Sequence, residues 1–407
     1  MENSLQPISS SSSYPKLEMS GTSDEESLKI FPDELIIEIL TWLPAKTLVK
    51  FRCVSKSWRA LISTPKFIKA HLRNSSKRDD YAHHRVLFRC GTEFGKTWVP
   101  NYETRYFPLA PALFGDVNTP IESTPVGDPV MNSSDVVIAG ASNGIVCVSV
   151  KTDLFFWNPT IRKFKKLPQF LSPANQRGKK YHVLFEYNEV DDDYQVCLID
   201  FGEKCVALYS GNTNSWRKIQ GFPGEFGHRY FFVRGKLYWG KGTARRIEIG
   251  YFDLKTETDG MLQQPDYGKG TFDLRVRAFQ GCLAVFCYHR TSHIDMWIWK
   301  EQGLRQFWTK VLLVPKLKDP SRKKFCVPIF MSKDGKILFK YWKIMALSDP
   351  MKKSVTYPRV KSMGELWIVE VFVESLLLIN DHDSKGPWKD TDLSAIDMIR
   401  HLAPHLV

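Results

Sequence analysis

The sequence predicts a mainly β fold with a small helical module near its N-terminus, and three observations lead to this prediction. Aromatic residues make up 13% of the 407 residues, a share that suits β-structure better than a helical bundle. From about residue 81 onward, short runs rich in Val, Ile, Phe, Tyr and Trp alternate with Gly, Asn and Asp, as in strands and turns. Residues 29–73 instead carry apolar side chains at helical spacing.

The first 28 residues predict a disordered tail. They contain nine serines and one basic residue against five acidic ones. Such a segment buries too little apolar surface to offset the entropy lost on ordering.

The helical module at 29–73 begins with an amphipathic pattern. Five apolar positions recur on one predicted face, and Pro44 is expected to end this first helix: Leu35, Ile36, Ile39, Leu40 and Leu43. Two further helices follow, with Ser55 as a cap, and Thr64-Pro65 predicts the start of a fourth, short helix. A unit of about 45 residues is near the lower size limit for independent folding. We therefore expect part of its apolar surface to meet a partner; docking onto the β-domain is the alternative.

The β region repeats itself with a period near 48 residues. A polar residue followed by glycine and an apolar run recurs at Gly144, Gly235, Gly281 and Gly335. An aromatic strand entering a polar turn recurs independently, with markers at Asn158, Ser210, Asp253 and Lys300. This period is typical of propeller blades and predicts a β-propeller-like domain of about six blades over residues 81–380. A β-sandwich with insertions is the alternative. Five prolines between residues 108 and 129 predict one long loop in the first blade.

Residues 31–62 resemble an F-box. The resemblance rests on an apolar-Pro-x-Glu-Leu start, an internal Leu-Pro and a Val-Ser-Lys-x-Trp signature, and Phe31 departs from the leucine usual at its position. The remainder resembles the kelch-like F-box-associated domain of a plant family that includes S-locus F-box proteins. The stretches that carry this likeness are Ser142–Cys147, Phe156–Lys163, Asp192–Val196, Tyr209–Trp216 and Val373–Leu376. The chain departs from the family pattern at 184–187 and 341–361.

The resemblance implies a three-helix F-box at 29–73 and a non-catalytic substrate receptor of an SCF-type ubiquitin ligase. A Skp-family adaptor, and through it a cullin-RING ligase, would bind the F-box, and an unidentified protein substrate would bind the β-domain. The implied adaptor-binding residues are Phe31, Pro32, Leu35, Ile36, Ile39, Leu40, Leu43, Pro44, Leu48, Val54 and Trp58. Some of these, notably Val54 and Trp58, are equally compatible with the module's own core. A scaffold that never joins a cullin, and a glycan-binding or enzymatic propeller, are the competing hypotheses.

The sequence gives little support for a phosphate-binding, metal-binding or catalytic site. Gly91–Thr97 has three residues between its glycines where a phosphate loop needs four. Cys282, Cys287, His289 and His293 lie close in sequence, but without a Cys-x-x-Cys pair we expect core cysteines and surface histidines, with neither a metal nor a cofactor. Asp191–Asp193 predicts a solvated turn. No Gly-x-Ser-x-Gly motif is present, so an enzyme is not expected.

Charge and hydropathy limit the kinds of partner and the cellular compartment that we expect. The net charge of +13 favours acidic partners, including an acidic protein substrate. Basic runs within 158–185 and 310–324 favour surface loops over a nucleic-acid site. No apolar stretch is long enough to span a membrane, and the eight scattered cysteines predict reduced, buried thiols. We therefore expect the cytoplasm, the nucleus or both. Within residues 381–407 we expect a tail with a short amphipathic helix.

Overall fold

The computed structural model describes twelve stretches of the chain. These are residues 33–92, 101–126, 131, 136–170, 181–223, 229–243, 246–289, 293–302, 305–315, 326–341, 344–363 and 365–377. The predicted tail at 1–28 and the amphipathic helix predicted within 381–407 lie outside these residues. Among the described helices, none is long and apolar enough to cross a membrane.

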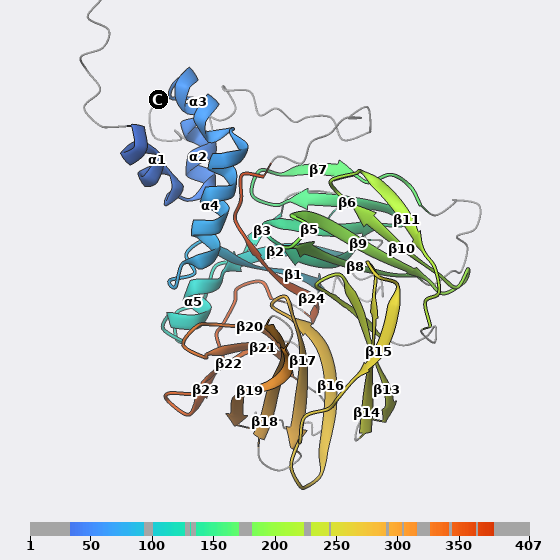
Figure 1. Ribbon diagram of the computed structural model, residues 1–407. Coiled ribbons are helices and arrows are strands. Elements are labelled where there is room, and N and C mark those ends of the chain that lie inside the picture. The colour runs from blue at the N-terminus through green and yellow to red at the C-terminus, as the bar shows by residue number, and fades with distance from the viewer. Residues whose placement is uncertain are drawn as a thin grey trace, which may run out of the picture.

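Six four-stranded antiparallel sheets form the β-domain, which confirms the predicted propeller of about six blades (Figure 1). Five of the blades are each made from four consecutive strands. Their bounds are β4 (Val136–Ser142), β5 (Ile145–Val150), β6 (Asp153–Asn158), β7 (Lys163–Lys166); β8 (Tyr181–Asn188), β9 (Asp193–Asp200), β10 (Cys205–Ser210), β11 (Ser215–Ile219); β12 (Tyr230–Val233), β13 (Lys236–Thr243), β14 (Arg246–Asp253), β15 (Thr258–Leu262); β16 (Phe272–Phe279), β17 (Cys282–His289), β18 (His293–Gln302), β19 (Arg305–Pro315); β20 (Val327–Met331), β21 (Ile337–Tyr341), β22 (Ile344–Asp349) and β23 (Ser354–Thr356).

The remaining blade joins the two ends of the domain. The order in its sheet is β24-β1-β2-β3, with β24 at Glu365–Val373, β1 at His84–Thr92, β2 at Asn101–Pro108 and β3 at Thr124–Pro125. The innermost strands β4, β8, β12, β16, β20 and β24 each contact the next around a closed ring. Closing the ring therefore requires β24, the last described strand, to pair with β1, the first.

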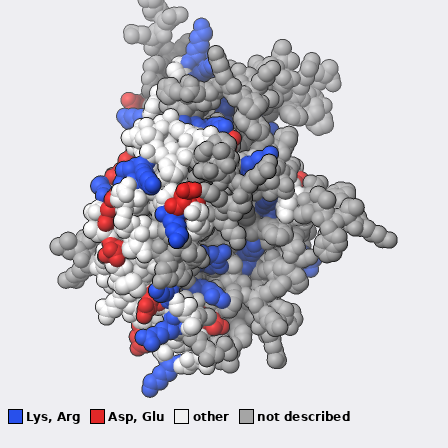
Figure 2. Space-filling view, turned by 90° about the vertical axis from the view of Figure 1, so that its right-hand side faces the viewer, with Lys and Arg blue, Asp and Glu red and all other residues white. Residues whose placement is uncertain are grey.

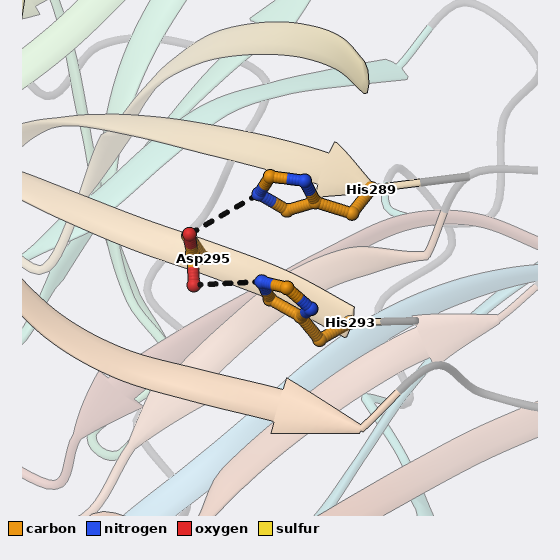
Figure 3. Close-up of side chains that lie close together, drawn as sticks. All are labelled: His289, His293 and Asp295. Carbon is orange, nitrogen blue, oxygen red and sulfur yellow. Dashed lines mark hydrogen bonds and ion pairs between the residues drawn. The ribbon is translucent and has the colours of Figure 1, made fainter. Parts of the chain in front are cut away.

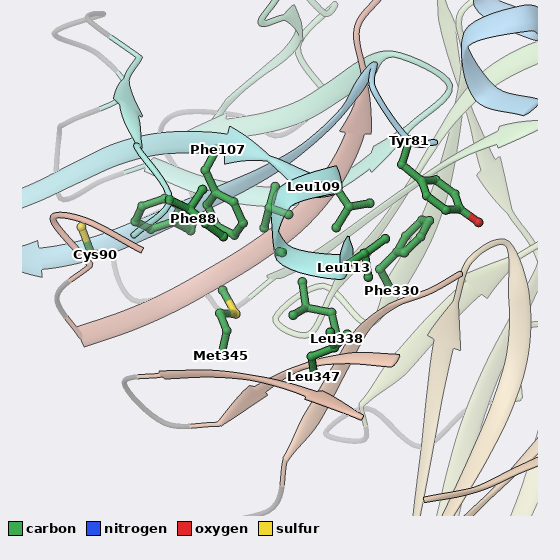
Figure 4. Close-up of a cluster of buried hydrophobic side chains, with 13 residues drawn as sticks. Tyr81, Phe88, Cys90, Phe107, Leu109, Leu113, Phe330, Leu338, Met345 and Leu347 are labelled. Atoms are coloured by element: carbon green, nitrogen blue, oxygen red, sulfur yellow. The ribbon is translucent and has the colours of Figure 1, made fainter. Parts of the chain in front are cut away.

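Large apolar side chains fill the space between the closing blade and its neighbour (Figure 4). Phe88 and Phe107 project from β1 and β2, and their rings lie 5.7 Å apart. Leu338 and Met345 of the neighbouring blade belong to the same buried cluster. Helix α5 (Leu109–Phe114) adds Leu109 and Leu113 to it. The predicted long proline-rich loop is therefore wrong at this point, because α5 and β3 interrupt it.

Turn chemistry explains why the sequence repeats. Asn143-Gly144, Arg234-Gly235 and Gln280-Gly281 are two-residue hairpin connections in which both residues have positive φ. This is the type I′ turn, whose twist matches that of the flanking strands. The polar markers Asn158 and Asp253 end strands, and their side chains accept hydrogen bonds from backbone N–H groups of the following turn. Lys300 does not mark a turn, because β18 continues to Gln302.

The two faces of the ring differ in the length of their connections. The hairpin turns at 143–144 and 280–281 lie on one face of the ring. Because neighbouring strands run antiparallel, connections from one blade's outermost strand to the next blade's innermost strand begin and end on the opposite face. Most of these connections are longer, for example 167–180 and 316–326, whereas the first face carries short turns apart from 109–123, which contains α5.

Four helices form the N-terminal module, one more than the three that the resemblance implied. They are α1 (Asp33–Thr41), α2 (Ala45–Phe51), α3 (Lys56–Ile62) and α4 (Pro65–Lys77). Ser55 and Thr64 cap α3 and α4, as predicted, by accepting hydrogen bonds from the backbone N–H groups of Trp58 and Phe67. Pro44 precedes α2 rather than ending α1, which already ends at Thr41.

The segment after β24 connects the ring to the helical module. It runs from β24 up beside α4 in Figure 1, and the Leu376 side chain is completely buried in the module's core. The buried Asn158 amide donates hydrogen bonds to the Ser375 carbonyl at 3.2 Å and to the Leu377 carbonyl at 3.1 Å. Arg85 donates to the buried Glu374 carboxylate at 3.1 Å. Chain closure and attachment of the module thus use the same segment.

Three buried histidines lie where α4 meets β1. The ring of His71 stacks on that of His83, and His83 Nδ1 lies 2.7 Å from the Ser75 hydroxyl. His84 packs edge-on against Tyr81 and Phe330. Burial lowers the pKa of His83 and of His84 from 6.5 to about 4, with nearby positive charge as a smaller cause. These side chains are therefore neutral in the folded protein near pH 7.

The eight cysteines form no disulfide, and all of them lie in the described part of the chain. Five are buried as predicted, but Cys53 is exposed, and Cys205 and Cys282 are half-buried. Cys53 lies in the connection between α2 and α3.

We predict that Gly144→Ala destabilises the protein more than Gly281→Ala. Both glycines occupy the same turn position with positive φ, so each alanine costs about 1–2 kcal/mol of backbone strain. A Cβ at Gly144 would also lie 2.5 Å from Ser375 Cβ, whereas no described atom lies within 4 Å at Gly281. The clash adds about 1–3 kcal/mol. Urea unfolding measures both variants, and equal losses would contradict the contact with Ser375.

We predict that acid weakens the junction through its histidines. Since the folded-state pKa of His84 is about 4 and its usual value is 6.5, the unfolded chain binds more protons as pH falls from 6.5 toward 4, and stability falls with it. His84→Phe removes this proton uptake while keeping a ring between Tyr81 and Phe330. The drop in melting temperature between pH 7 and pH 5 should therefore be smaller in His84→Phe than in the wild type. An identical drop in both proteins would contradict the lowered pKa.

Candidate functional site

Helix α1 and the two residues that follow it carry apolar side chains that point in two directions. Ile36, Leu40 and Leu43 point into the module, where Leu40 is 2% exposed. Leu35 and Ile39 point outward and are 46% and 59% exposed, and Trp42, one turn further on, is 48% exposed. A helix that only packed on its own module would need one apolar stripe. The second stripe is therefore the candidate site, and we call Leu35, Ile39 and Trp42 the outward stripe.

The inward face of α1 holds the outward stripe in place. Leu40 packs with Leu48, Ile62, Phe67 and Leu376 in one buried cluster. Thr41 accepts a hydrogen bond from the Asn74 amide of α4 at 3.0 Å, and the Leu43 carbonyl lies 2.9 Å from His71 Nε2. These contacts fix both the position and the rotation of α1.

The structure sorts the predicted adaptor-binding residues into three groups. Leu40 and Leu48 are buried in the module's core, so they support the surface from below and are not available to a partner. Leu35, Ile39, Pro44 and Val54 are exposed, and Ile36, Leu43 and Trp58 are half-buried. Phe31 and Pro32 lie outside the described residues. Leu40 and Leu48 are therefore core residues rather than surface contacts, because their side chains pack with Ile62, Phe67 and Leu376. The contact of the remaining residues with an adaptor stays a prediction.

The sequence left open whether Val54 and Trp58 lie on the surface or in the core, and the structure distinguishes the two residues. Val54 is 63% exposed in the connection between α2 and α3. Trp58 packs against Phe51 with ring centroids 5.4 Å apart. Sequence reasoning missed Ile37 and Trp42, which are 37% and 48% exposed. The spacing of Trp42, three residues after Ile39 and seven after Leu35, was the signal for its place on the outward stripe.

The acidic cluster at Asp191–Asp193, which the sequence analysis singled out, has a structural role. Asp193 is buried and accepts a hydrogen bond from the Asn212 backbone N–H at 2.9 Å. Asp192 pairs with Lys69 of α4, so this turn also ties the ring to the module. Asp191 and Asp192 are exposed, as expected for a solvated turn, whereas Asp193 is buried at the start of β9.

The basic runs form no separate site among the described residues. Lys166 pairs with Asp153 at 2.8 Å, and Lys310 pairs with Asp295 at 2.8 Å. In the view of Figure 2, Lys and Arg side chains lie dispersed among Asp and Glu on the described surface. Residues 171–180 and 316–325, which hold the rest of both runs, lie outside the described residues, as does most of the glycine-rich stretch at 91–97.

Two carboxylates of the ring have raised pKa values that burial explains. Glu186 accepts hydrogen bonds at 2.6 Å from the backbone N–H groups of Arg234 and Gly235 in the next blade. Burial raises its pKa to about 7, against the lowering effect of those two bonds. Burial likewise raises the pKa of Glu370, on the innermost strand β24, to about 7. Glu186 connects two blades, which assigns it a structural role.

Comparisons with known proteins agree with both parts of the architecture. A family model described as the F-box associated beta propeller domain matches residues 125–369, and the F-box domain model matches residues 28–70. An F-box/kelch-repeat protein of Arabidopsis thaliana is 26% identical over 382 residues, covering 88% of this chain and 100% of the relative.

Two further Arabidopsis thaliana relatives show the same relation. F-box protein CPR1 is 26% identical, with 85% of this chain and 88% of the relative covered. Another F-box protein is 28% identical, with 75% of this chain and 80% of the relative covered. The outward stripe, with Leu35 and Ile39 on α1 and Trp42 directly after it, lies inside the residues that the F-box model matches. The chain therefore belongs to the family of F-box proteins that carry an F-box-associated β-propeller domain.

Proposed function

We propose that this chain is the substrate-recognition subunit of an SCF-type ubiquitin ligase. The observation that carries the proposal is the outward stripe on a module joined to the propeller by buried contacts. Leu35, Ile39 and Trp42 offer an apolar contact to a Skp-family adaptor, and the adaptor would link the chain to a cullin-RING ligase.

The attachment of the module supports the proposed mechanism, which is proximity. Leu376 in the module's core, the Lys69–Asp192 pair and the hydrogen bond from Lys46 to the Tyr106 hydroxyl at 2.8 Å hold the helices against the ring. A substrate bound to such a ring stays near the ubiquitin-loaded enzyme, which raises the effective concentration of its lysines. In this proposal the chain itself contributes no catalytic group.

The face opposite the module is the proposed substrate surface. The module contacts the face with the short turns, through Asp192 in the β8–β9 turn and through Lys333, which donates to the Lys77 carbonyl at 3.1 Å. The longer connections between blades begin and end on the other face, and binding residues concentrate on such loops. The net charge of +13 favours an acidic protein substrate there, reached in the cytoplasm or the nucleus.

We predict that Leu35→Asp combined with Ile39→Asp strongly weakens adaptor binding without unfolding the chain. Both side chains are exposed, so the free protein tolerates the charges, whereas the complex must bury them. Hot-spot substitutions of this kind cost about 2–4 kcal/mol, which weakens binding roughly 30- to 1,000-fold. Binding of a purified Skp-family adaptor to the full chain measures the effect.

A matched control distinguishes the loss of a specific contact from a general effect of added negative charge. Met261 is 58% exposed on β15, which lies away from the module, so Met261→Asp places a carboxylate on an exposed apolar position of the ring and should leave adaptor binding unchanged. Unaltered binding in the Leu35/Ile39 variant, or no binding by the wild type, would refute the proposed contact. Reconstituted ubiquitylation of a captured target then separates a ligase receptor from a scaffold that binds the adaptor alone.

A further inference from the structure

A histidine pair and a buried carboxylate meet at one end of the β17–β18 hairpin (Figure 3). His289 ends β17 and His293 begins β18, and both rings point at Asp295. His289 Nε2 lies 3.2 Å from Asp295 Oδ2, and His293 Nε2 lies 3.4 Å from Asp295 Oδ1. The two imidazole rings stack with centroids 4.1 Å apart.

Strand geometry brings these groups together. Cys287 of β17 is paired with Asp295 of β18, and side chains two residues apart on a strand share a face. His289 and His293 therefore lie on the same face of the sheet as Asp295, beside the Cys287 thiol. The sequence prediction of surface histidines is corrected here, because the side chains of His289 and His293 are 12% and 25% exposed.

The distances between donor atoms are those of a metal coordination shell. Zinc–nitrogen and zinc–oxygen bonds of about 2.0–2.2 Å place neighbouring ligands of a tetrahedron about 3.3–3.6 Å apart. The two nitrogen–oxygen separations, 3.2 and 3.4 Å, are close to that range, and the three ligand atoms all lie within 4.8 Å of one another. Small side-chain shifts would suffice to seat an ion.

Asp295 supplies the strongest reason to expect an additional cation. Its side chain is buried, and among the described residues Oδ1 accepts no hydrogen bond. A buried carboxylate oxygen without a hydrogen bond is costly. Oδ2 differs, because the Lys310 ammonium lies 2.8 Å away. Lys310 thus neutralises one oxygen and leaves the other facing His293.

We propose that His289, His293 and Asp295 form a binding site for a divalent transition-metal ion of the zinc class. Imidazole nitrogen with a carboxylate suits zinc and its neighbours, whereas calcium and magnesium prefer oxygen ligands alone. The sequence predicted no metal because it considered Cys282 and Cys287 as the thiolate pair. Cys282 lies at the other end of β17, and Asp295 takes its place in the ligand set.

An ion at this site would connect the end of β17 to the start of β18. The 280–281 turn, at the start of β17, lies on the face of the ring that the helical module contacts. The end of β17 and the start of β18 therefore lie on the opposite face. The ion would act there as a cross-link between two strands, independently of the adaptor-binding function.

The test titrates the untagged, chelator-treated full chain with zinc chloride. We expect one equivalent to bind with a rise in melting temperature, and cobalt(II) to give the visible d–d bands of a low-symmetry, tetrahedral-like site. His289→Gln with His293→Gln keeps N–H donors next to Asp295 but removes both nitrogen ligands. This variant should keep the wild-type melting temperature without metal and lose the stoichiometric binding and the cobalt bands. His182→Gln, in another blade, is the matched control and should bind normally.

Lys310→Met separates a metal site from an ion-paired histidine cluster. Removing the ammonium takes away a positive charge next to the ligands, so zinc affinity should rise roughly tenfold or more. A cluster that only pairs Asp295 with Lys310 gains no zinc affinity in this variant. Absence of stoichiometric zinc binding by the wild type, or binding that survives loss of both histidines, would overturn the proposal.

Discussion

The structure depends on one segment, the pairing of β24 with β1 and the four residues that follow it. The register sets Val86 opposite Val371 and Phe88 opposite Val369, which closes the ring between residues almost 300 positions apart. Loop-closure entropy opposes such a contact, so the buried cluster between the first and last blades must compensate for it. The same segment then places Leu376 inside the helical module. Ring closure and the position of the outward stripe are thus mechanically connected.

Three of the stretches that identified the family by resemblance meet at this junction. Asn143-Gly144 forms the tight turn that leaves room for Ser375, and the Ser375 hydroxyl donates to the Gly144 carbonyl at 3.3 Å. Asn158 binds the backbone on both sides of Leu376 through its amide. The Ser375 backbone N–H donates to the Thr160 hydroxyl at 3.2 Å. These residues therefore hold the module onto the ring, which gives a physical reason for these motifs.

The sequence predicted what local chemistry determines. Type I′ turns recur in three of the five blades made from consecutive strands, and capped strand ends such as Asp253 recur between them, so the period and the approximate number of blades could be read from these local features. Long-range packing could not be predicted in this way, because nothing in the local sequence distinguishes Leu40, which is buried, from Ile39, which is 59% exposed. Asp295 was missed because its histidine partners are defined by strand pairing across a hairpin. The apolar positions of α1 were found, but their division between core and surface needed Leu376 and α4.

The most direct test of this account is hydrogen exchange of the full chain carrying Leu376→Ser. The variant removes the apolar contact that the C-terminal segment makes with the module and leaves the pairing of β24 with β1 intact. We predict that amides of α2, α3 and α4 lose protection by a factor of roughly 30 to 1,000, in line with about 2–4 kcal/mol for a buried leucine, while amides of the ring keep theirs. Unchanged protection of the module would contradict the claim that this segment holds the outward stripe in place.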